Sequence, residues 1–113
     1  MLECIFVVYM DRIEKIKGML ETQPDDCFLL HALGLEFLKL NQIEEAILQF
    51  EKVIKVNEEY VGTYYHLGRA YEKTGNREKA VNIYEKGIII AKSQKNMHAK
   101  SELQMVLEEL IDN

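Results

Sequence analysis

The chain repeats itself with a period of 34 residues, and this feature constrains its fold more than any other. When the sequence is shifted by that amount, large, small and aromatic residues fall on residues of the same kind. The coinciding pairs are Leu30 with Tyr64, Leu33 with Leu67, Gly34 with Gly68, Phe37 with Tyr71, Asn41 with Gly75, Ala46 with Ala80, Ile47 with Val81, Phe50 with Tyr84 and Ile54 with Ile88. A fixed period of about 20–50 residues is typical of architectures that stack one small structural unit.

Each repeat has the pattern of two amphipathic helices joined by a short turn. In the second repeat, Tyr64, Leu67 and Tyr71 recur at helical spacing and therefore share one face. The segment from Ala80 to Ile88 has the same periodicity, and Gly75 followed by Asn76 is a turn signal between the two. The sequence therefore predicts an all-α fold built from helix–turn–helix units.

A glycine occupies the same position inside the first helix of both repeats, at Gly34 and Gly68. Glycine in a helix interior costs about 1 kcal/mol relative to alanine, so its recurrence indicates a steric requirement. The simplest requirement is a close approach of the paired helix. We expect a small alanine of the second helix to lie opposite each glycine and an aromatic ring to close the gap.

These residues resemble the tetratricopeptide repeat (TPR), a helical pair with a large residue, Leu-Gly and Tyr in its first helix and Ala and Phe in its second. Residues 27–60 and 61–94 match as two repeats. The proline that ends the family's pattern is replaced by Glu58 and Lys92. The resemblance implies a short stand-alone TPR protein, an α-solenoid of antiparallel helix pairs.

We expect one TPR domain over residues 1–113, with a tail at 1–9, a half-repeat helix at 10–24, repeats at 27–60 and 61–94, and a capping helix at 95–113. The half repeat, the two repeats and the cap are counted as five helices. The predicted helical segments are residues 11–22, 26–40, 43–57, 59–74, 77–91 and 98–111. Asp11 is expected to cap the first of them, and residues 92–96 to form a linker longer than the other turns. Residues 1–9 could form a disordered tail, an apolar strap or a strand-like segment.

Composition excludes several classes of protein. The formal charge of −5 disfavours a nucleic-acid or anionic-membrane surface. The longest apolar run, residues 4–10, is far shorter than the roughly 20 residues that a membrane-spanning helix needs. Two cysteines, Cys4 and Cys27, are too few for a disulfide scaffold and favour a reducing, cytoplasmic setting.

The sequence contains no enzyme signature: no glycine-rich phosphate loop, nucleophile elbow or His-Glu-x-x-His motif. Cys27 and His31 lie four residues apart on one predicted helix, and His66 could approach from the next repeat. Zinc prefers four ligands, and these residues supply three. We therefore expect no catalytic residue, no metal and no cofactor, with a metal-binding or catalytic domain as a remote alternative.

The resemblance implies that a peptide or partner protein binds a concave groove lined by the first helices. Its contact positions fall on Phe28, His31, Leu35, Tyr65, Arg69, Glu72 and Lys73. Because His31 and Leu35 replace the lysine and asparagine with which some family members clamp a C-terminal carboxylate, we do not expect that particular role. We predict an interaction adaptor; the alternative is a homodimer that buries the apolar groove residues. Phe28 and Leu35 could also simply pack against the first and last helices.

Overall fold

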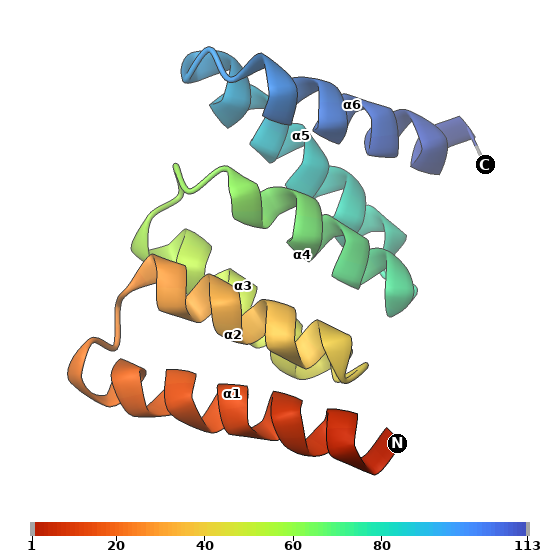
Figure 1. Cartoon of the computed structure of the whole chain (residues 1–113). Helices are drawn as coiled ribbons and strands as arrows, with labels where there is room; N and C mark the ends of the chain where they lie inside the picture. The colour runs from red at the N-terminus through yellow and green to blue at the C-terminus, as the bar shows by residue number, and fades with distance from the viewer. Residues whose placement is uncertain (1, 113) are drawn as a thin grey trace. The chain divides into compact units, whose positions relative to one another are not determined.

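The computed structural model describes the backbone of residues 2–112 and the side chains of residue 8 and residues 10–112 (Figure 1). Over this part of the chain the secondary structure consists of six helices and no strand. They are α1 (Leu2–Thr22), α2 (Cys27–Lys39), α3 (Ile43–Val56), α4 (Gly62–Lys73), α5 (Arg77–Ser93) and α6 (Met97–Asp112). The predicted all-α class is confirmed.

The helices form two compact units, residues 1–57 and 58–113. In unit 1, α2 packs against α1 and α3; in unit 2, α5 packs against α4 and α6, and α4 also touches α6. The predicted count of five helices is wrong, because a half repeat, two whole repeats and a cap comprise six. The structure groups these six as three and three, whereas we divided them into a half repeat, two repeats and a cap. One domain over residues 1–113 stays a prediction.

Three turns of the same geometry join α2 to α3, α4 to α5 and α5 to α6. The residue at each bend has a positive φ, 59° at Asn41, 79° at Gly75 and 58° at Lys95. The next amide donates to the carbonyl oxygen five residues back, at an N–O distance of 2.9 Å in every turn. This pattern is the Schellman motif, which satisfies carbonyl groups that a helix end leaves without partners. The predicted long linker at residues 92–96 is wrong, because α5 extends to Ser93 and only residues 94–96 connect it to α6.

Side-chain caps fix the starts of three helices. Asp26 accepts a hydrogen bond from the amide of Leu29 at 3.0 Å, and Asn96 accepts one from the amide of Ala99 at 3.1 Å. Asn76 caps α5 in the same way, at 3.4 Å. Such caps stabilise a helix by about 1 kcal/mol because they satisfy amides that have no partner within the helix.

The first helix differs from the prediction at its N-terminus. It begins at Leu2, so Asp11 is an exposed residue within the helix and caps nothing. Residues 2–9 are helical, whereas we treated residues 1–9 as a separate tail; Met1 lies outside the described residues. No glycine or proline stands between Leu2 and Asp11 to end a helix there, and the 34-residue period carries no signal in this stretch because it has no counterpart in the repeats.

The close approach predicted at the paired glycines is confirmed. A Cβ atom on Gly34 would meet the ring of Phe50, and one on Gly68 would lie 2.6 Å from two carbons of the Tyr84 ring. Both rings are fully buried. The glycine hydrogen therefore leaves room for the aromatic ring itself, and this ring, not the alanine, is the nearest neighbour.

Candidate functional site

The predicted contact residues of unit 1 share one side of α2. Phe28, His31 and Leu35 follow one another at spacings of three and four residues, which places them on one helix face. Phe28 is 69% exposed, so it is not packed away beneath another helix. Leu35 is half-buried, and the His31 ring lies 5.6 Å from the ring of Phe50, tilted by 49°. This face therefore presents one exposed aromatic side chain, Phe28, next to a histidine whose ring lies near the buried ring of Phe50.

The predicted contact residues of unit 2 share one side of α4. Tyr65, Arg69, Glu72 and Lys73 fall within one arc of the helix, and Arg69 and Lys73 are exposed. The Arg69 guanidinium lies 3.8 Å from a carboxylate oxygen of Glu72. The half-buried Tyr65 ring contacts the ring of His66 edge-on, with 5.4 Å between centroids. An aromatic ring and a guanidinium therefore stand one helical turn apart on this face.

Sequence reasoning missed the residue beneath this face, Tyr84 of α5. Its buried hydroxyl donates a hydrogen bond to the same carboxylate oxygen of Glu72 that faces Arg69. Burial raises the pKa of Tyr84, and the bond to Glu72 raises it further. Tyr84 therefore holds the Glu72 carboxylate from the core side, and the exposed Arg69 guanidinium faces the same carboxylate oxygen. The signal in the sequence is the hydroxyl at position 84, where the first repeat has Phe50.

The residues weighed for a metal site have other interactions. The Cys27 thiol lies 3.8 Å from the carbonyl oxygen of Val53, and burial raises its pKa. Burial lowers the pKa of His66, while Glu102 of α6 acts in the opposite direction. Among the side chains that the structure describes, no three His, Cys, Asp or Glu residues gather to hold a metal ion. None of the described helices is long and apolar enough to cross a bilayer.

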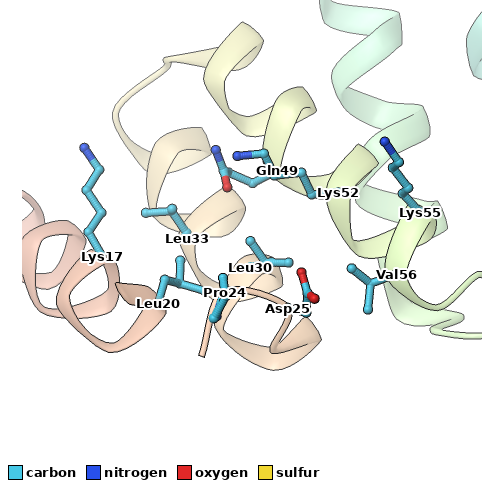
Figure 2. A pocket seen from close by; sticks show the side chains of 10 residues that line it. All are labelled: Lys17, Leu20, Pro24, Asp25, Leu30, Leu33, Gln49, Lys52, Lys55 and Val56. Atoms are coloured by element: carbon cyan, nitrogen blue, oxygen red, sulfur yellow. The ribbon is translucent and has the colours of Figure 1, made fainter. Parts of the chain in front are cut away.

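A pocket of about 820 Å³ opens in unit 1 between α1, α2 and α3 (Figure 2). Leu20, Leu30, Leu33 and Val56 provide its apolar lining. Charged residues also line it: Lys17, Asp25, Lys52 and Lys55. None of the predicted contact residues lines this pocket, so it is a second surface, separate from the α2 face.

Comparison with known proteins identifies the family. The profile described as "TPR repeat" matches residues 34–75, and the one described as "Tetratricopeptide repeat" matches residues 61–94. A solution structure of a tetratricopeptide repeat domain protein from Salinibacter ruber is 36% identical, with a TM-score of 0.73. That alignment covers 77% of this chain and 88% of the relative.

Two further proteins show how far the similarity extends. The chloroplast protein PYG7 of Arabidopsis thaliana, a tetratricopeptide repeat domain-containing protein, is 31% identical over 65 residues. These cover 58% of this chain but only 22% of PYG7, so the chain spans about a fifth of that relative. PcrH, solved in complex with the chaperone-binding region of PopD, has the same fold at a TM-score of 0.86 and 13% identity, covering 97% of this chain and 84% of PcrH. The repeated glycine–aromatic pairs, the matching profiles and the Salinibacter relative agree that this chain belongs to the tetratricopeptide repeat family.

Proposed function

We propose that the chain is a non-catalytic interaction module whose first-helix faces, on α2 and on α4, bind a peptide or partner protein. The observation that carries this proposal is the α4 face, where Tyr65 and Arg69 are presented side by side. Tyrosine and arginine are enriched among the residues that dominate the energy of protein interfaces. PcrH, which has this fold, binds a segment of PopD, and this supports a peptide or protein as the partner class.

The electrostatics of the α4 face favour a partner with a carboxylate next to an apolar side chain. The Arg69 side chain is 45% exposed although it faces Glu72, so part of the guanidinium charge is left for an incoming anion. Tyr65 supplies apolar area beside it, and Lys73 adds a positive charge one turn further along α4.

We expect Tyr65→Ala and Arg69→Ala each to weaken capture of the partner by about thirtyfold, since truncating an interface anchor commonly costs about 2 kcal/mol or more. The measurement is capture from a cell lysate on immobilised parent and variants, followed by quantitative mass spectrometry of the retained proteins. Neither side chain is part of the buried core, so both variants should melt close to the parent.

Glu44→Ala and Glu85→Ala serve as matched controls, because both carboxylates are exposed and lie on the second helices α3 and α5. A partner retained by the parent and by both controls, but lost with Tyr65→Ala and Arg69→Ala, supports the proposal. Equal retention by all five proteins would place binding away from the α4 face and contradict it.

A further inference from the structure

The pocket of unit 1 is a positively charged site on an acidic chain. Three lysines and one carboxylate, Asp25, line it, although the whole chain has a formal charge of −5. Lys17 lies with its ammonium 5.9 Å from the centroid of the Phe37 ring. Within the described part of the chain, neither Lys52 nor Lys55 forms an ion pair with a carboxylate. The site therefore combines an apolar lining with cations suited to an acidic, apolar ligand.

One face of α6 has the complementary chemistry. Met97, Ser101, Met105, Glu108 and Asp112 are all exposed, and they follow one another at spacings of four, four, three and four residues. At 3.6 residues per turn these positions fall within an arc of about 80°. Met97 is 59% and Met105 54% exposed, whereas Leu103 and Val106, on other sides of the helix, are buried. We call these five residues the α6 stripe.

We propose that the α6 stripe of one copy of the chain docks on the unit 1 pocket of a second copy. Met105 enters the apolar lining formed by Leu20, Leu30, Leu33 and Val56, because an unbranched, polarisable side chain adapts to irregular gaps. Glu108 and Asp112, about one helical turn apart, then pair with Lys52 and Lys55. The two surfaces are opposite in charge, and each exposes apolar atoms that the other can cover.

This contact is heterologous, since a pocket on one copy meets a helix on the next. In such a pair, one copy has an unused pocket and the other has an unused stripe. Association therefore continues past the dimer unless the geometry closes a ring. The ion pairs lie at an exposed rim, and salt screens such pairs. Association should therefore increase with protein concentration and weaken with added salt.

Sedimentation equilibrium of the whole chain over a wide concentration range tests the proposal. We expect the average mass to rise well above the 13.2 kDa of one chain and to return toward it in high salt. The charge reversals K52E/K55E and E108K/D112K should each weaken association by more than about tenfold, because like charges then face each other. K15E/K92E, at two exposed lysines outside both surfaces, makes the same change in net charge as K52E/K55E and should associate like the parent.

Mixing the two reversed variants gives the most specific result. In K52E/K55E the pocket and the stripe are both acidic, and in E108K/D112K both are basic, so copies of one variant repel each other. In a mixture, the stripe of either variant meets a pocket of opposite charge on the other variant. We therefore expect the mixture to associate and neither variant alone to do so. Met105→Ala, which changes no charge, should weaken association without altering its salt dependence, and circular dichroism verifies the fold of every variant.

Four results would overturn the proposal. Two of them are a parent that stays at the mass of one chain at every concentration and a mixture of reversed variants that fails to associate. A third is loss of association in Phe28→Ser when both charge reversals leave association intact, which would assign self-association to the α2 face instead. An acidic protein from a lysate that needs Lys52 and Lys55 while the parent stays monomeric would likewise replace the second copy as the occupant.

Discussion

Gly68→Leu should lower the free energy of unfolding by about 1–3 kcal/mol, the usual cost of overpacking a well-packed core. Even the first carbon of the new side chain would overlap the Tyr84 ring. That ring has little freedom to move, because it is fully buried and its hydroxyl is bound to Glu72. Small domains have only about 5–15 kcal/mol of stability in total, so the loss is a substantial fraction.

Alanine substitutions provide a matched test of this explanation. Gly68→Ala should lower the melting temperature, whereas Gly18→Ala should raise it. No atom lies within 4 Å of a Cβ placed at Gly18, which is exposed within α1, and alanine there gains about 1 kcal/mol of helix propensity. Thermal unfolding followed by circular dichroism measures both. If Gly68→Ala raises the melting temperature, steric contact with Tyr84 is not the reason for the glycine.

Alkaline pH should lower the free energy of unfolding of unit 2 by about as much as the Gly68→Leu substitution does. Burial, together with the nearby charge of Glu58, raises the pKa of Tyr64 from 10.0 to about 12. Between these values the unfolded chain releases the phenolic proton and the folded chain retains it. The stability present below pH 10 is therefore lost as the pH rises to about 12, by roughly 2–3 kcal/mol from this residue. Tyr84, whose pKa is also raised, adds to the loss in the same direction.

The part of this loss that comes from buried tyrosines should be confined to unit 2, because the equivalent residues of unit 1 are Leu30 and Phe50, which have no hydroxyl. Hydrogen exchange measured above pH 10 cannot resolve fast amides, so urea unfolding at a series of pH values is the better measurement. Tyr64→Phe removes the ionisable group and also the hydrogen bond of 2.6 Å to the carbonyl oxygen of Glu58. We expect this variant to be less stable near pH 8 but to lose less stability than the parent between pH 10 and 12. Parallel curves for parent and variant would contradict the explanation.

The fold was predictable from the sequence at two kinds of position: where one residue type determines a local backbone geometry, and where the same residue type recurs at the equivalent position of the other repeat. The recurrence of Gly34 at Gly68 was sufficient to predict the close approach of the paired helices. The turn at Lys95 was missed, because a lysine gives no sign of the positive φ that Asn41 and Gly75 suggest. The predicted cap at Asp11 was wrong for a related reason. An aspartate side chain suits a helix start, but here the residues before it are also helical.

The candidate site was predictable only at the level of helix faces. Spacing alone places Tyr65, Arg69 and Glu72 on one side of α4, and the structure agrees. The support that Glu72 receives from Tyr84 depends on how α4 and α5 pair, which single-helix periodicity does not specify. The pocket of unit 1 depends on the packing of three helices, so no short motif indicates it. Whether the predicted contact residues bind a partner stays a prediction that the capture experiment tests.

The local packing within unit 1 has a consequence for how the protein is made. Its helices are neighbours in sequence and pack in that order, α1 on α2 and α2 on α3, so closing each contact requires only a short loop. Helical proteins with such local contacts fold in microseconds to milliseconds. Ribosomes add only about 5–20 residues per second. Unit 1 has all of its internal packing partners once Asn57 has emerged from the ribosome, and we expect it to bury Phe37 and Phe50 while unit 2 is still being synthesised.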